Sequence, residues 1–122
     1  PGHDQMHNNL GTLLLRVGDW AAAEQHLRQA LLLGGDSAAV WRNLSGALQG
    51  QERREEAQDA LRQALAADPT YAPAWLDLGN LLLSAGQRHE AQKAWRNFLQ
   101  HWRGDDSVAE GVRQLLRQEA LQ

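Results

Sequence analysis

The chain has 122 residues, of which 43% are hydrophobic and 22% are charged, with a formal net charge of −3. This is the composition of a soluble globular protein of about one domain; no apolar run approaches the ~20 residues of a membrane span, and a pI near 5.9 argues against a nucleic-acid-binding surface. The absence of cysteine excludes disulfides, thiolate catalysis and cysteine-based zinc sites, and the compartment stays open, with the cytoplasm favoured.

Apolar residues at helical spacing alternate with Gly or Pro about every 15 to 18 residues along the chain. Asp36 or Ser37 is suited to cap a helix, and Gly18 and Gly86 are suited to the left-handed conformation that ends one. Gly50 lies two places earlier in the period, so the turn after it is expected to differ. The pattern predicts helices at residues 4–17, 20–33, 37–50, 53–67, 71–85 and 88–102.

A fixed interval relates these helices. Trp41 and Trp75 lie 34 residues apart, and they begin the similar segments WRNLSGAL and WLDLGNLL. Four further apolar positions recur three times at this interval: Leu10, Leu44 and Leu78; Leu14, Leu48 and Leu82; Ala23, Ala57 and Ala91; and Leu31, Leu65 and Leu99. A fixed period of this length indicates a stacked repeat protein.

The repeated unit resembles the tetratricopeptide repeat, a helix-turn-helix unit of 34 residues. The resemblance is clearest in the third repeat, which contains Trp75-x2-Leu78-Gly79-x2-Leu82 followed by Ala91-x3-Trp95-x2-Phe98. In the second repeat Ser45 replaces the usual glycine, and in the first repeat His7 replaces the tryptophan. The resemblance covers residues 4 to about 105, and it implies an all-α, right-handed superhelical α-solenoid. We expect one domain with repeats at 4–37, 38–71 and 72–105 and a capping helix at 106–122.

Small residues mark the expected contact within each helix pair. Gly11, Ser45 and Gly79 occupy one position of the period and are expected to face Ala23, Ala57 and Ala91, so that the two helix axes approach closely. The tryptophans are expected to fill the space between the helices as core residues.

The two ends of the chain differ. The expected last helix has a polar side and an apolar side, and the apolar side holds Val108, Val112, Leu115, Leu116 and Leu121, which suits a helix that closes a stack. The first helix has more apolar surface than an outermost helix needs, with Leu10, Leu13, Leu14, Leu15 and Val17. Three explanations stay open: further repeats precede it, a second copy covers it, or this face is simply exposed. Because Met6 is the only methionine, we expect the chain to be a processed product or a fragment of a longer protein.

Enzymatic chemistry finds little support in the sequence. No glycine-rich phosphate loop or Ser, His and Asp set occurs in a pattern that this fold would bring together. His3 and His7 are four residues apart, but no glutamate lies between them as in a zinc-protease helix. We expect a non-enzymatic chain without a metal or cofactor.

The resemblance places the candidate site in a concave groove, which the first helix of each repeat lines in this family. The groove positions of this sequence are Asn8, Asn9, Thr12, Arg16, Arg42, Asn43, Gly46, Asp77 and Asn80. Because asparagine amides both donate and accept hydrogen bonds, such a surface suits the backbone of an extended peptide. The family's clamp for chaperone C-terminal carboxylates uses lysine, arginine and asparagine, and only Asn43 of that set is present here. A co-chaperone function is therefore not expected.

Two functions fit these features. The first is a protein–protein interaction module that binds a peptide or a partner helix in the groove. The alternative is a structural scaffold or self-association segment of a larger protein, in which the uncovered face of the first helix makes the contact, so a homo-oligomer stays open.

Overall fold

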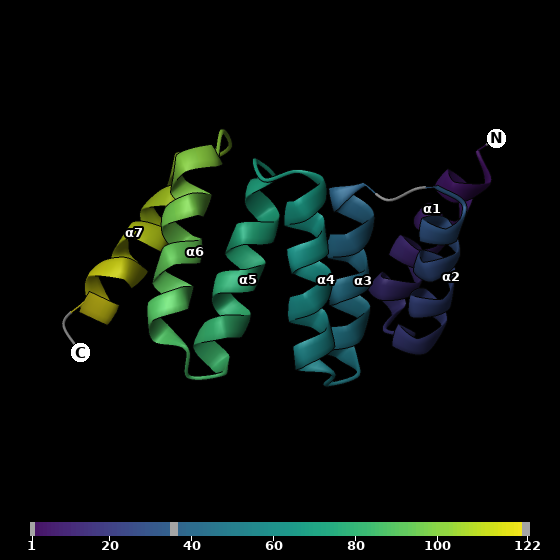
Figure 1. Ribbon diagram of the computed structural model, residues 1–122, viewed down its shortest axis with the longest axis horizontal. Coiled ribbons are helices and arrows are strands. Elements are labelled where there is room, and N and C mark those ends of the chain that lie inside the picture. Colours follow the sequence, from purple (N-terminus) through teal and green to yellow (C-terminus); the bar gives the residue numbers. More distant parts are fainter. Residues whose placement is uncertain (1, 35–36, 121–122) are drawn as a thin grey trace. The chain divides into compact units, whose positions relative to one another are not determined.

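The computed structural model describes residues 2–34 and 37–120, and it folds them into helices with no strand in those ranges. Contacts divide the chain into two compact units, one from Pro1 to Pro69 and one from Thr70 to Gln122, which are described separately (Figure 1). The first unit contains α1 (His3–Val17), α2 (Trp20–Leu32), α3 (Ala38–Gly50) and α4 (Arg54–Ala67). The second contains α5 (Ala72–Ser84), α6 (Arg88–His101) and α7 (Asp106–Ala120).

The first six helices begin and end within one residue of the positions that the sequence predicts. Ser37 caps α3 by accepting a hydrogen bond from the backbone N–H of Val40 at 3.3 Å, while Asp36 lies outside the described residues. Gly18 and Gly86 both adopt the left-handed conformation with φ of 80°, as predicted. Local turn chemistry therefore fixes the helix ends.

The turn after α3 differs from the turns at Gly18 and Gly86, as expected. The residue that corresponds to Gly18 and Gly86 is Glu52, and it adopts the left-handed conformation with φ of 60°. Gly50 is needed for another reason, because a Cβ atom on it would lie 2.2 Å from the indole ring of Trp20. The glycine of this turn thus serves helix packing, and a glutamate takes the strained backbone conformation.

In the first unit α2 packs against both α1 and α3, and α3 packs against α4. Ala23 and Ala57 are fully buried, as expected of the close contacts within each pair. The atom nearest to Gly11 belongs to Leu27, however, since a Cβ on Gly11 would lie 2.7 Å from Leu27 Cγ and 3.5 Å from the Ala23 carbonyl oxygen. The small residue of α1 therefore accommodates the side chain one turn beyond the alanine.

The second unit is built around α6, which packs against α5 and α7. Its core contains Ala72, Trp95, Phe98 and Val112. Gly79 makes room for Trp95, because a Cβ on Gly79 would lie 2.4 Å from the indole Cδ1 and Nε1 atoms. As in the first unit, the partner of the small residue lies one turn beyond the buried alanine, here Ala91.

Helix α7 covers one side of α6, as a capping helix should, but its buried face is rotated from the predicted one. Ala109 and Val112 are buried, whereas Val108 and Leu115 are 38% and 36% exposed, so the prediction that these two lie on the packed face is wrong. The ring of Trp102 also packs against the core of this unit and stacks on Phe98, with the ring centroids 5.2 Å apart. Leu121 lies outside the described residues.

Three tryptophans, Trp95, Trp75 and Trp41, are core residues to different degrees, whereas Trp20 is 36% exposed. Trp95 is fully buried, while Trp75 is half-buried against the core of the second unit. Trp41 is half-buried too, and it lines a hollow of about 200 Å³ in the first unit together with Leu44 and Ala60.

Candidate functional site

Three of the predicted groove residues meet in the first unit. The Nδ2 atom of Asn43 on α3 donates a hydrogen bond to Asn8 Oδ1 at 3.2 Å and another to Thr12 Oγ1 at 3.4 Å. Thr12 Oγ1 in turn donates to the backbone carbonyl of Asn8 at 2.9 Å. We call Asn8, Thr12 and Asn43 the Asn43 cluster. It connects α1 and α3 through residue pairs that are 35 and 31 positions apart in the sequence.

Helical spacing explains why these residues meet. Asn8 and Thr12 are four residues apart on α1 and therefore lie one above the other on the same face. On α3, Gly46 lies one turn below Asn43, and a Cβ on it would be 3.8 Å from the Leu15 side chain of α1. The α1–α3 surface is thus polar at the Asn43 cluster and apolar one turn further along both helices.

The remaining groove residues of this unit are not in the cluster. Asn9, which shares the repeat position of Asn43, is exposed and accepts a hydrogen bond from Gln5 Nε2 at 3.0 Å. Arg16 is exposed and Arg42 is half-buried. Asn9 and Asn43 therefore do not meet, although they share a repeat position, and the partner of Asn43 is Asn8.

In the second unit, Asp77 and Asn80 lie three residues apart on one face of α5. Asp77 is half-buried, and Asn80 is exposed and accepts a hydrogen bond from the buried Trp95 Nε1 at 3.3 Å. This bond orients the Asn80 amide and satisfies the only polar atom of the Trp95 side chain. The predicted site residue therefore also has a structural function.

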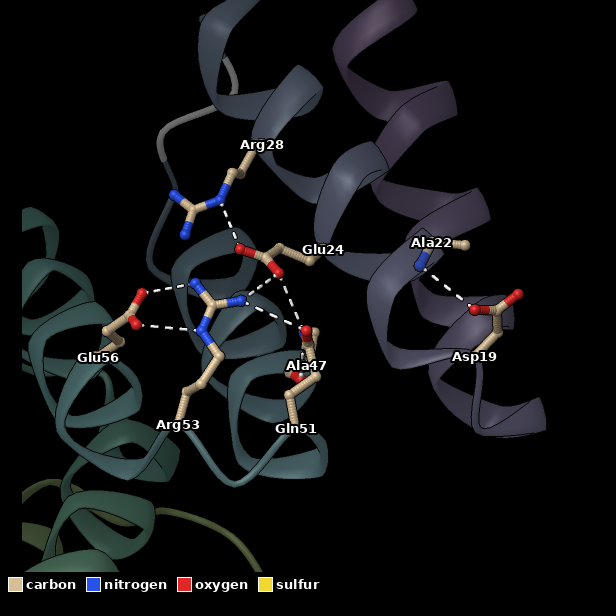
Figure 2. Close-up of polar contacts among 8 residues, drawn as sticks. All are labelled: Asp19, Ala22, Glu24, Arg28, Ala47, Gln51, Arg53 and Glu56. Carbon is tan, nitrogen blue, oxygen red and sulfur yellow. Dashed lines mark hydrogen bonds and ion pairs between the residues drawn. The ribbon is translucent and has the colours of Figure 1, made fainter.

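An ion-pair network joins α2 to the α3–α4 turn. Within α2, Arg28 Nε donates a hydrogen bond to Glu24 Oε2 at 2.9 Å. Figure 2 shows that Glu24 Oε1 also accepts hydrogen bonds from Arg53 Nη1 at 2.7 Å and from Gln51 Nε2 at 3.0 Å. Arg53 makes a two-bond contact with Glu56 at 3.0 and 2.6 Å. We call Glu24, Arg28, Gln51, Arg53 and Glu56 the Glu24 network.

The network shifts the pKa values of its members. Burial of Glu24 acts to raise the pKa of its carboxyl, but hydrogen bonds from Gln51, Arg28 and Arg53 outweigh it and leave the pKa below its ordinary value. The hydrogen bonds with Arg53 lower the pKa of Glu56, and those with Glu56 and Glu24 raise the pKa of Arg53. The carboxylates of Glu24 and Glu56 and the guanidinium of Arg53 are therefore charged at neutral pH, and the network stabilises the packing of α2 on α3.

A second unpredicted contact joins two histidines within the first helix pair. The Nδ1 atoms of His7 on α1 and His26 on α2 are 2.9 Å apart, and the rings stack with their centroids at 5.2 Å. A pattern in the sequence could have revealed this contact. The repeat positions of His7 and His26 hold Trp41 and Ala60 in the second repeat, so two rings of intermediate size replace a large and a small side chain.

Metal-binding and membrane-spanning features are not found in the described part of the chain. Within residues 2–34 and 37–120, no three histidine, aspartate or glutamate side chains are grouped so that they could hold a metal ion. None of the helices described there has the length and apolar character needed to cross a membrane.

Comparison with known sequence families identifies the repeat. Residues 3–70 match one description of the tetratricopeptide repeat, and residues 48–95 match another. The chain belongs to the tetratricopeptide repeat (TPR) family. No curated protein matches this TPR chain.

Solved TPR structures match the fold closely. The Yersinia enterocolitica type III secretion chaperone SycD, in complex with a peptide of the translocator YopD, is 13% identical with a TM-score of 0.88, and the match covers 96% of this chain and 92% of SycD. MamA is 25% identical with a TM-score of 0.80, over 99% of this chain and 74% of MamA. The second TPR of Spaghetti (RPAP3), bound to the HSP90 peptide SRMEEVD, is 20% identical with a TM-score of 0.77, over 82% of this chain and 93% of that structure. These similarities agree with the all-helical α-solenoid fold class.

Proposed function

We propose that this TPR chain is a non-enzymatic interaction module that binds an extended peptide of a partner protein across the α1–α3 surface. The observation that supports the proposal is the convergence of Asn8, Thr12 and Asn43 from two helices. Both bonds of Asn43 are donated by its amide nitrogen, which orients its carbonyl oxygen to accept a hydrogen bond from a peptide N–H. Arg16 and Arg42 add cationic side chains to the same two helices and favour a peptide with acidic residues.

The structural relatives support peptide binding as the general function, because SycD and the RPAP3 domain were both solved with peptides. The peptide bound by this chain should differ from that of the RPAP3 domain. A C-terminal carboxylate needs cationic side chains in the groove, whereas this chain has Asn8 and Thr12 there, with Pro73 and Asp77 at the corresponding positions of the second unit. We expect no saturable binding of SRMEEVD to this chain.

Selection from a random peptide library displayed on phage, followed by fluorescence anisotropy with the selected peptide, tests the proposal. Asn43→Ala removes two oriented hydrogen bonds and the acceptor for the peptide, and we expect it to weaken binding by about tenfold or more, on the order of 1–2 kcal/mol. Asn97→Ala on α6 is the matched control, since its amide donates only to the Lys93 carbonyl of its own helix. Equal affinities of the two variants for the peptide would contradict the proposal.

A further inference from the structure

One side of α1 is apolar and uncovered. Met6, Leu10, Leu13 and Val17 are 53%, 37%, 56% and 76% exposed, and they follow one another at intervals of four, three and four residues. We call these four residues the α1 stripe. Their spacing is that of the contact seam of a coiled coil, so the stripe lies along one straight edge of the helix.

The second repeat shows what kind of surface this is. The residues at the positions of Met6, Leu10 and Leu13 are Val40, Leu44 and Ala47 on α3, which are at most 4% exposed. Helix α3 is covered because it packs against α2 and α4. The α1 stripe therefore has the register of a surface that a neighbouring helix buries.

The fourth position indicates which helix fits. Val17 corresponds to Gln51, whose amide binds Glu24 of α2 at 3.0 Å. A helix with the charge pattern of α2 would place a carboxylate against Val17 and would leave it without a partner. The partner of the stripe must therefore place an apolar residue against Val17.

We propose that the α1 stripe binds the α1 stripe of a second copy of this chain, with the two helices antiparallel about a two-fold axis. The stripe is symmetric about a point between Leu10 and Leu13. A two-fold axis at that point pairs Leu10 with Leu13 of the second copy and Met6 with Val17 of the second copy. Every apolar residue of the stripe then has an apolar partner, including Val17.

Charge does not oppose this pairing. The stripe itself contains no charged residue. Arg16, which flanks it, lies 4.5 residues from the symmetry point, so the two Arg16 backbones are about 13 Å apart along the helix at 1.5 Å per residue. This distance exceeds the Debye length of ~8 Å at physiological ionic strength, and the repulsion is largely screened.

The buried area predicts a weak dimer. The exposed parts of the four side chains amount to roughly 350 Å² per copy, or roughly 700 Å² in total, below the ~1,200 Å² of a stable interface. We therefore expect a monomer–dimer equilibrium with a dissociation constant on the order of 0.1–1 mM. This association does not involve the Asn43 cluster, and it is independent of the proposed peptide binding.

Sedimentation velocity of the full chain between 10 μM and 1 mM tests the association. We expect a dimer at the upper concentrations, and we expect Leu13→Glu to raise the dissociation constant at least tenfold. Leu32→Glu is the matched control, because Leu32 is 79% exposed on α2 and lies outside the stripe. A monomer at every concentration, or equal loss of the dimer in both variants, would overturn the proposal; circular dichroism checks that both variants fold.

Cross-linking tests the antiparallel geometry, and it is straightforward because the chain has no cysteine. With a short bis-maleimide, a mixture of Met6→Cys and Val17→Cys chains should give a covalent heterodimer, while neither variant alone should cross-link efficiently. If each variant cross-linked efficiently with itself and the mixture gave no heterodimer, the two helices would be parallel, and the two-fold pairing would be refuted.

Discussion

Replacing Gly79 with alanine tests the packing within the second unit. A Cβ at this position would lie 2.4 Å from two atoms of the Trp95 indole, whereas ordinary contacts begin near 3.4 Å, so the ring has to move by about 1 Å. Trp95 is fully buried in a core cluster with Ala72, Phe98 and Val112, so its ring can move only by displacing these neighbours.

The magnitude follows from three contributions. Alanine improves helix propensity by about 1 kcal/mol. Overpacking against a rigid buried ring costs about 1–3 kcal/mol. Movement of the ring also breaks its hydrogen bond to Asn80, which contributes about 1 kcal/mol. We expect Gly79→Ala to lower the free energy of unfolding by about 1–3 kcal/mol.

Urea denaturation followed by tryptophan fluorescence and circular dichroism measures this change. With a slope of about 2 kcal/mol per M, the midpoint should fall by about 0.5–1.5 M. Gly111→Ala on α7 is the matched control, because a Cβ there meets no atom within 4 Å, and we expect it to stabilise the protein by about 0.5–1 kcal/mol. If Gly79→Ala were as stabilising as Gly111→Ala, the close contact with Trp95 would be refuted.

Three further predictions test other parts of the structure. Glu52→Gly should stabilise the chain by about 0.5–1 kcal/mol in thermal unfolding, because it relieves a left-handed backbone, whereas Gly18→Ala should destabilise it; a destabilising Glu52→Gly would show that the turn is not strained. The pKa of Glu24 is lowered in the folded state. Its contribution to the free energy of unfolding is therefore present above the ordinary pKa of 4.5 and is lost as the pH falls through the lower folded value. Glu24→Gln should therefore cost about 1–2 kcal/mol at pH 7 and little at pH 3, and an equal cost at both pH values in urea titrations would contradict this. Ala57→Leu should cost about 1–3 kcal/mol by overpacking a fully buried site, and unchanged stability in urea would show that the helices of this pair are not closely packed.

The sequence predicted the helices well because their ends depend on local chemistry. The helical spacing of the apolar residues, the caps and the glycines of the turns each act over a few residues, and they place the first six helices within one residue of their observed bounds. The same local rules explained why the turn at Gly50 is different, although not that Trp20 packs over that glycine. Contacts between distant side chains were beyond these rules.

The candidate site was predicted in part. The family resemblance selected Asn8, Thr12 and Asn43, and the structure brings these three together. It also selected Asn9, whose side chain is exposed and accepts a hydrogen bond from Gln5, four residues earlier on the same helix. The Glu24 network was missed because it joins residues of a helix and of a turn nearly 30 positions away, and such pairings depend on helix packing that no local pattern encodes.

The most direct test of the proposed function is an NMR titration of the asparagine side-chain amides with a peptide selected from the phage library. If the peptide lies on the α1–α3 surface, the side-chain amide signals of Asn43 and Asn8 should shift in a saturable manner. The dissociation constant from these shifts should equal the one measured by anisotropy. The side-chain amide signal of Asn97 should not shift. Saturable shifts confined to residues of α2 and α4, with the Asn43 and Asn8 amides unchanged, would contradict the proposal that the Asn43 cluster binds the peptide.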